Sequence, residues 1–270
     1  MGRVTPTRTR RHLHHDGRDR TWLEITAADG TADTLVMFLH GSLQSGSVAR
    51  TFTGRTFDAF ASRGCAVVYP DGVDHHFNDL RRSFNETART LNVDDVGFLR
   101  ELIALYGARR VIGCGFSNGG QMLLRMLVDA PGALHGVALF GAPAPTDDNM
   151  LRAPAGWVPT PILAVQGTAD PIVPYEGGEA GIGPANRGTA RSALDSARYL
   201  AFLNGSEQHE RSRPTPTVTV DTWSGGAPVE LWSLDGVGHL VPSPARLDER
   251  LGPGTDAVVG ADLVSDYFSL

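Results

Sequence analysis

The hexapeptide Gly115-Phe116-Ser117-Asn118-Gly119-Gly120 joins a short apolar run that ends at Cys114 to an amphipathic run, Gln121 to Asp129. A Gly-x-Ser-x-Gly pattern between a strand and a helix is typical of a strained turn that exposes the serine hydroxyl at the carboxyl end of the strand. The flanking glycines leave room for such a turn and let the helix pack close to the sheet. The free N–H groups of the helix N-terminus favour negative charge at the same place. The pattern therefore predicts a nucleophilic Ser117.

The composition suits one large domain. The chain has 270 residues, is 41% hydrophobic and carries a net charge of −6. Its basic side chains other than His are all Arg, and they are scattered rather than gathered in a stripe. We therefore expect no nucleic-acid partner. A mechanism that uses a lysine base or a Schiff base is excluded, because the chain has no Lys.

The two cysteines, Cys65 and Cys114, fall at opposite ends of probable parallel strands, which is too far apart for a disulfide. We expect two buried free thiols and no need for an oxidising compartment. Residues 1–20 are rich in Arg and His and hold no apolar stretch, so the sequence predicts no signal peptide. It also predicts no transmembrane segment. The expectation is a cytoplasmic protein without a membrane partner; the sequence does not reveal its oligomeric state.

Apolar runs that read as strands alternate with amphipathic runs along the chain. Such alternation predicts an α/β fold, with a mostly parallel central sheet and helices on both faces. We expect residues 1–15 to be an N-terminal tail and residues 16–270 to be a single catalytic domain. The expected strands are Thr21–Thr26, Thr34–Leu39, Ala66–Tyr69, Arg110–Cys114, Gly136–Phe140, Ile162–Gln166 and Val229–Leu234, and the expected helices are Val93–Tyr106, Gln121–Ala130 and Ala257–Phe268.

Two long segments, near residues 72–92 and 175–226, show no strong periodicity of hydrophobic residues. Both follow the ends of expected strands. Ligands of open α/β sheets bind beyond the carboxyl ends of the strands. We therefore interpret both segments as lid or substrate-binding loops.

A serine nucleophile needs a base, and the base needs an acid to orient it. In the α/β-hydrolase fold these follow the serine in the order acid, then His. Asp170 lies just past the expected strand Ile162–Gln166 and is the preferred acid. Asp147, Asp148 and Glu176 are the alternatives.

The base is assigned by the same order. Only His209 and His239 follow Asp170 among the nine His residues. His209 lies in a polar run with no strand before it, whereas His239 follows the last expected strand and a glycine-rich turn. The sequence therefore predicts a Ser117–Asp170–His239 triad.

An oxyanion hole requires two N–H donors. One is expected from Asn118, the residue after the nucleophile, and the other from the loop after Thr34–Leu39. In that loop Ser42 is the better candidate and Leu43 the second. His40 is expected to bond the loop backbone rather than to transfer protons.

No cluster of His, Cys or carboxylate residues has the spacing of metal ligands, and Gly113-x-Gly115 continues into the serine turn rather than into a dinucleotide-binding fingerprint. We expect neither a metal nor a cofactor.

Several segments together resemble the polyhydroxybutyrate-depolymerase-like esterases, a group that includes feruloyl and acetylxylan esterases. The resemblance extends from about Asp16 to Phe268. The segments that carry it are Leu39–Ser42, Tyr69–Gly72, Phe77–Arg81, Val93–Phe98, Gly115–Gly120, Gly167–Asp170 and Gly238–His239.

The resemblance implies the same triad and the hydrolysis of carboxylic esters through an acyl-enzyme. Members of the group usually carry Trp where this chain has Phe77, and secreted members often have a disulfide where this chain has Ser206 and the segment after Trp223. The missing disulfide and signal peptide favour a small soluble ester over a polymer. A thioesterase, an acyltransferase or a peptidase could use the same triad, and a catalytically silent binding protein is the alternative outside the enzymes.

Overall fold

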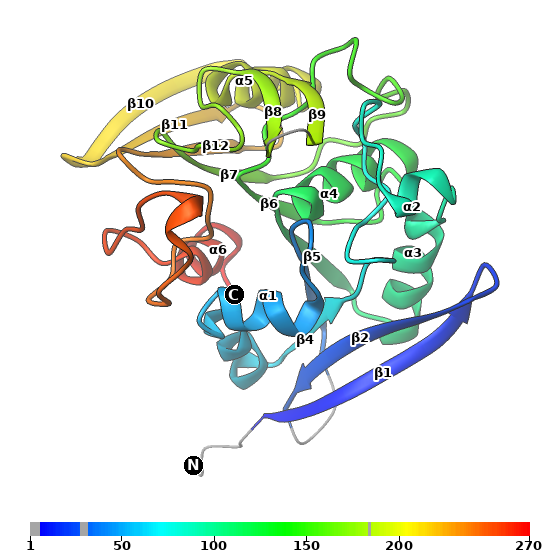
Figure 1. Ribbon diagram of the computed structural model, residues 1–270. Coiled ribbons are helices and arrows are strands. Elements are labelled where there is room, and N and C mark those ends of the chain that lie inside the picture. Colours follow the sequence, from blue (N-terminus) through cyan, green and yellow to red (C-terminus); the bar gives the residue numbers. More distant parts are fainter. Residues whose placement is uncertain (1–5, 28–31, 183–184) are drawn as a thin grey trace.

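A central sheet runs through the computed structural model, which describes residues 6–27, 32–182 and 185–270 (Figure 1). Within those residues the sheet has ten strands in the order β1-β2-β4-β3-β5-β6-β7-β12-β11-β10. The strands from β4 to β12 in this order are parallel to one another, and antiparallel strands extend both edges. The predicted mostly parallel sheet is therefore confirmed.

The strands are β1 (Thr7–His15), β2 (Arg18–Thr26), β3 (Thr34–Leu39), β4 (Cys65–Pro70), β5 (Arg110–Phe116), β6 (Gly136–Phe140), β7 (Ile162–Gly167), β8 (Gly178–Ile182), β9 (Ala185–Ala190), β10 (Gln208–Thr215), β11 (Val218–Ser224) and β12 (Val229–Leu234). The α-helices are α1 (Gly46–Phe52), α2 (Thr87–Thr90), α3 (Asp95–Tyr106), α4 (Asn118–Asp129), α5 (Ala193–Leu203) and α6 (Gly260–Phe268), and the 3₁₀ helices are η1 (Thr56–Arg63) and η2 (Glu249–Leu251).

The two faces of the sheet carry separate hydrophobic cores. Successive side chains of a strand point to opposite faces. In β3, Leu35 and Met37 belong to the core that also contains side chains of α3, α4 and α5, whereas Val36 and Phe38 belong to the core that contains side chains of α1, η1 and α6. A strand that is buried on both faces reads as a continuous apolar run. This is why the sequence predicts the bounds of β3 and β6 correctly. The bounds of β12 are also as expected, although its burial alternates over Val229–Trp232.

The expected N-terminal tail is a strand for most of its length. Thr7–His15 forms β1 and pairs antiparallel with β2 from Thr7 opposite Thr26 to His15 opposite Arg18; residues 1–5 lie outside the described residues. The hydropathy pattern misses β1 because most of its side chains are exposed. Backbone hydrogen bonds and ion pairs hold it instead, including that of Arg11 with Glu24 at 3.0 Å.

The prediction of a long loop over 175–226 is also wrong, because the segment contains regular secondary structure. It contains a separate hairpin, β8–β9, then α5, and then the strands β10 and β11 of the main sheet; residues 183–184 lie outside the described residues. Every residue of β10 is exposed, so the strand has no apolar side to signal it. The loop prediction is closer for 72–92, where α2 is the only described helix.

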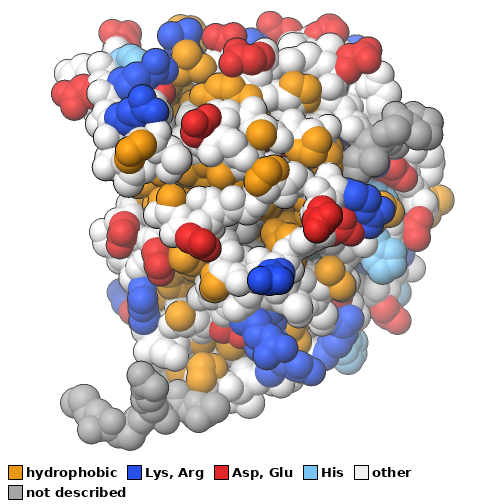
Figure 2. Space-filling view, turned by 60° about the vertical axis from the view of Figure 1, so that its left-hand side comes forward, with side chains coloured by type: hydrophobic (Ala, Val, Ile, Leu, Met, Phe, Trp, Pro, Cys, Tyr) orange, Lys and Arg blue, Asp and Glu red, His pale blue; other side chains and the backbone are white. Residues whose placement is uncertain are grey.

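The surface charges are mixed, and the two cysteines are free and buried as expected. Acidic and basic side chains are interspersed over most of the face shown in Figure 2. Cys65 and Cys114 are buried free thiols, and burial raises the pKa of both. Among the described residues, no helix combines the length and the apolar character that crossing a membrane requires.

Candidate active site

Ser117 lies at the turn between β5 and α4. Its backbone has φ 52° and ψ −116°, a conformation that side chains other than glycine rarely adopt. The turn is close-packed, since a Cβ on Gly115 would lie 2.6 Å from the backbone of Gly119, and a Cβ on Gly119 would lie 2.2 Å from the Leu39 carbonyl oxygen. The glycines are therefore required by the close approach of backbone segments. The helix begins at Asn118, three residues before the expected start.

Asp170 and His239 are in contact. His239 Nδ1 lies 2.7 Å from Asp170 Oδ2, and both residues are buried. The backbone N–H groups of Ile172 and Val173 donate to Asp170 Oδ1, each at 2.8 Å. The side chain of Gln166 donates to Asp170 Oδ2 at 3.0 Å. Four donors therefore fix the orientation of the carboxylate.

The imidazole of His239 is held from several sides. Its backbone N–H donates to the Leu251 carbonyl at 2.6 Å, and the Phe116 ring packs 4.7 Å from its ring. Gly141, at φ 59°, lies beneath it, and a Cβ there would be 2.9 Å from the imidazole. Ser117 and His239 line the same pocket.

The loop after β3 contains the two candidates for the second oxyanion-hole donor, and one of them already donates its N–H group within the protein. The Leu43 N–H donates to the His75 carbonyl at 3.1 Å. Within the described part of the chain, the N–H groups of Ser42 and Asn118 have no protein acceptor. Ser42 also lines the Ser117 pocket. The geometry thus favours Ser42 over Leu43 as the partner of Asn118.

His40 supports this loop from within the core. Its Nδ1 lies 2.8 Å from the Gly41 carbonyl oxygen, and the Gly72 N–H donates to its Nε2 at 2.9 Å. This pattern requires a neutral ring with the proton on Nδ1. Burial lowers the pKa of His40 to about 4, although the bond to Gly41 opposes the shift. The ring is therefore neutral at pH 7, as its expected structural role requires.

The main pocket, with a volume of about 270 Å³, lies above Ser117. Residues from both expected lid segments contribute to it, Arg81 and Glu86 from the first and Arg187 from the second. Glu86 and Arg187 form an ion pair, and Arg81 pairs with Asp79 at 2.5 Å. Apolar side chains form much of the pocket wall, and each charged side chain in the lining is paired with an opposite charge. Its lining is Ser42, Leu43, Gln44, Arg81, Glu86, Phe116, Ser117, Ile172, Val173, Ala180, Gly181, Arg187, His239 and Leu251.

The rejected alternatives do not line this pocket. His209 is in β10 and lies 2.7 Å from Asp221. Asp147 is exposed and pairs with Arg191. Asp148 and Glu176 are exposed as well.

The residues that support the triad leave little signal in the sequence. Gln166 ends an expected strand, and nothing in its pattern indicates a bond to Asp170. Gly141 follows β6 directly, and a glycine at a strand end was the one available signal for it. Both roles depend on distances between segments that are far apart in the sequence.

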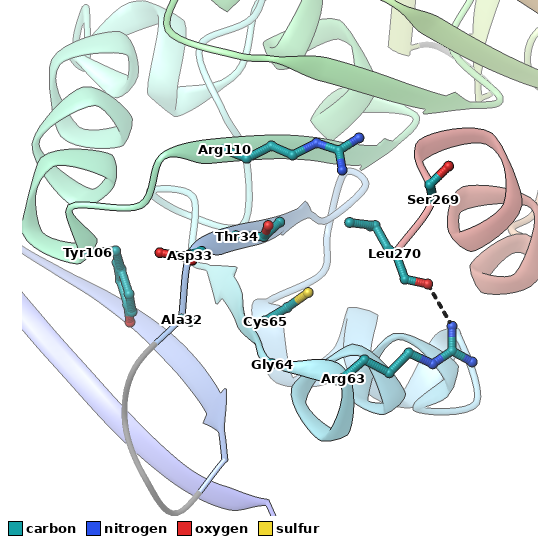
Figure 3. Close-up of a pocket in the computed structure, with 10 residues that line it drawn as sticks. All are labelled: Ala32, Asp33, Thr34, Arg63, Gly64, Cys65, Tyr106, Arg110, Ser269 and Leu270. Carbon is teal, nitrogen blue, oxygen red and sulfur yellow. Dashed lines mark hydrogen bonds between the residues drawn. The ribbon is translucent and has the colours of Figure 1, made fainter.

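A separate cavity of about 680 Å³ lies at the amino ends of the central strands (Figure 3). Thr34, Cys65 and Arg110, which begin β3, β4 and β5, line it. Arg63 donates to the Leu270 carbonyl oxygen there at 3.1 Å. Because Ser117, Asp170 and His239 follow the carboxyl ends of their strands, this cavity is not part of the candidate active site.

Comparison with known proteins gives similarity to esterases. Residues 71–181 match the phospholipase/carboxylesterase family. A putative esterase, NocK of Nocardia uniformis subsp. tsuyamanensis, is 31% identical over 185 residues, which are 63% of this chain and 51% of that protein. Feruloyl esterase B of Piromyces equi is 27% identical over 206 residues, 72% of this chain and 37% of that protein. The chain thus spans about half or less of the length of these curated relatives.

Solved structures show the same fold. The acetyl xylan esterase of Aspergillus awamori has a TM-score of 0.65 at 13% identity and covers 97% of this chain, with 99% of its own chain matched. A dienelactone hydrolase of Anabaena variabilis has a TM-score of 0.51 at 14% identity, with 98% of each chain covered. The chain therefore has the α/β-hydrolase fold. The two sequence relatives are named as esterases, in line with the resemblance.

Proposed function

We propose that this protein is a serine esterase that hydrolyses carboxylic esters of small soluble molecules through an acyl-enzyme. One observation carries the proposal: the 2.7 Å contact between His239 and Asp170 lies at the pocket that Ser117 also lines. The esterase relatives support it, although each matches only over part of its length.

Each residue has a definite role in this mechanism. Ser117 Oγ attacks the ester carbonyl carbon while His239 Nε2 takes its proton. Asp170 accepts the Nδ1 proton of His239 in a hydrogen bond, which fixes the tautomer and stabilises the imidazolium. His239 then gives the proton to the leaving alcohol. In the second half-reaction it takes a proton from water while the water oxygen attacks the acyl carbon. It then returns that proton to Ser117 Oγ as the bond between Oγ and the acyl carbon breaks and the acid is released.

The developing oxyanion is stabilised by backbone N–H groups. Those of Asn118 and Ser42 are the proposed donors, since both lack a protein acceptor in the described residues. Such donors act on charge that appears only in the transition state, and the loss of one typically costs ~10²–10³ in rate.

The direct test is Ser117→Ala, which removes the nucleophile. We expect this variant to lose hydrolysis of p-nitrophenyl acetate and labelling by a fluorophosphonate probe. Ser224→Ala, at the exposed end of β11, is the matched control and should keep both. Full hydrolysis by Ser117→Ala would rule out the mechanism.

A substrate panel tests the reaction class. Oxygen esters should be hydrolysed faster than thioesters or aminoacyl amides of the same acyl group. A preference for thioesters or amides would replace esterase by thioesterase or peptidase. A folded protein that neither reacts with the probe nor turns over any member of the panel would be a silent binding protein.

A further inference from the structure

A narrow pocket meets the main pocket at Ser117. Its volume is about 10 Å³, which is the space of about one water-sized group. It shares Arg81, Ser117, Val173 and Ala180 with the main pocket. The residues that line the narrow pocket alone are Gln121, Gly141, Pro145, Asn149, Gly188, Thr189 and Ala190.

Gln121 lines the narrow pocket and carries an unused acceptor. The side chain is 5% exposed, and its Nε2 donates to the Pro143 carbonyl at 2.7 Å. Its Oε1 is buried and has no hydrogen-bond partner among the described residues. A flipped amide would place two acceptors together at Pro143, so the carbonyl bond fixes the orientation. A buried amide oxygen without a partner calls for a donor from outside the protein.

The position of His239 indicates which pocket holds the alcohol of the ester and which holds the acyl group. His239 must protonate the leaving alcohol, so the alcohol has to lie in a space that His239 lines. His239 lines the main pocket but not the narrow one, whereas Ser117 lines both. The alcohol therefore fits the main pocket, and the acyl group is left with the narrow one.

The far wall of the narrow pocket is firmly held. The side chain of Asn149 accepts from the Ser83 N–H at 3.0 Å and donates to the carbonyls of Arg187 and Thr189, each at 3.0 Å. A Cβ on Gly188 would lie 2.5 Å from this side chain. A long acyl chain would have to break these contacts.

We propose that the narrow pocket binds the acyl group of the substrate, and that Gln121 selects a short acyl group ending in a hydrogen-bond donor, such as glycolyl. This inference rests on the proposed esterase function. Ser117 Oγ forms the bond to the acyl carbon, the bond to the alcohol oxygen breaks, and the alcohol leaves with the proton from His239. The acyl hydroxyl donates to Gln121 Oε1 and is unchanged by the reaction.

The first experiment measures acyl length. For the wild type, kcat/KM should fall at least tenfold from p-nitrophenyl acetate to p-nitrophenyl hexanoate. Gln121→Ala enlarges the narrow pocket and should reduce this fall to less than threefold. Hexanoate turnover equal to that of acetate in the wild type would overturn the assignment of the acyl group to this pocket.

The second experiment isolates the effect of a hydrogen-bond donor on the acyl group. Methyl glycolate and methyl propionate differ by a hydroxyl in place of a methyl, and a pH-stat follows both. The ratio of their kcat/KM values should fall at least fivefold from the wild type to Gln121→Met, which keeps the volume and removes the acceptor. Comparing the two proteins cancels the different chemical reactivity of the two esters. Leu251→Ala, in the main pocket only, should leave the ratio unchanged.

Gln121→Leu removes the same acceptor, should lower the same ratio and covers a folding failure of Gln121→Met. A further variant tests the acyl assignment alone. Ala190→Val narrows the same pocket without touching the amide and should lower turnover of glycolate and propionate relative to acetate at least fivefold. An unchanged glycolate-to-propionate ratio in Gln121→Met, as expected if Oε1 only holds a structural water, would overturn the inference. Fluorophosphonate labelling separates the two failures: a labelled, active enzyme with an unchanged ratio loses only this inference, whereas an unlabelled, inactive protein loses the proposed function.

Discussion

The side chain of Asn118 is hydrogen-bonded to that of Asp79, with 2.7 Å between Asn118 Nδ2 and Asp79 Oδ2. The same amide pairs with the backbone of Phe77, accepting from its N–H at 2.8 Å and donating to its carbonyl at 3.0 Å. Next to these contacts, the Asn78 N–H donates to Asp95 Oδ2 at 2.7 Å. Three of the segments that carry the resemblance to esterases are thus joined in one buried polar network beside Ser117.

This network makes Asn118→Ala a test of how the serine turn is held. The substitution keeps the backbone N–H but leaves buried polar groups of Phe77 and Asp79 without partners, each of which is costly. We expect the free energy of unfolding to fall by about 2–4 kcal/mol, measured by urea denaturation. Thr90→Ala, on the short helix α2, is the control and should change it by less than about 0.5 kcal/mol. Equal stability of the two variants would show that the network does not hold the turn.

The sequence predicted the parts of the fold that hydrophobic burial specifies. The strands β3 and β6 read as apolar runs because both of their faces are covered. The strands β1 and β10 were missed because their side chains are exposed. Edge strands of this kind are held by backbone pairing with a neighbour, which leaves no periodic signal.

The same limit applies to the candidate site. Ser117, Asp170 and His239 could be chosen because chain order and strand ends constrain them. Gln166 and Gln121 could not, since their importance depends on which atom each amide faces. Leu43 could be ranked below Ser42, but only the bond from its N–H to His75 gives a physical reason.

Gly141 offers a second test, because it combines a positive φ with contact to the imidazole of His239. Gly132 has a positive φ of 82° and open space around its Cβ position, so Gly132→Ala carries the backbone cost alone. Both alanine variants should lose roughly 1–2 kcal/mol from the backbone. Only Gly141→Ala should also displace His239, and we expect its kcat to fall at least a hundredfold. Equal kcat values for the two variants would contradict the close approach.

Gln166→Leu tests the support of the triad carboxylate. The substitution removes the donor to Asp170 Oδ2 while leaving the two backbone donors to Oδ1. Because one of four hydrogen bonds to a charged group is lost, we expect kcat for p-nitrophenyl acetate to fall roughly tenfold with little change in KM. Asp170→Asn should be far more severe, with a loss of ~10⁴ in kcat, since the His239 tautomer is then wrong. The decisive result is a smaller loss of kcat in Gln166→Leu than in Asp170→Asn. A Gln166→Leu enzyme as slow as Asp170→Asn would refute a merely supporting role for Gln166.

The pH dependence of stability should report on His15, which joins β1 to α3. Its ring lies 2.8 Å from Glu101 and 3.1 Å from Asp94. Burial lowers the pKa of His15, but the hydrogen bonds to Glu101 and Asp94 outweigh it, so the pKa lies above the ordinary value of 6.5. A raised pKa in the folded state means that the stabilisation is fully present below the unfolded value and is lost as the pH rises through the folded one.

His15→Gln, which is neutral at every pH, isolates this effect. Between pH 5 and pH 6 the variant should be less stable than the wild type, and the difference should shrink steadily towards pH 9. Because both carboxylates are about half exposed, we expect the difference at low pH to be at most about 1 kcal/mol. Urea denaturation of both proteins across this range measures it, and His12→Gln, on the same exposed strand, serves as the control. A difference that stayed constant with pH would mean that His15 acts by packing, since a charged contact with Glu101 and Asp94 requires the loss on the alkaline side.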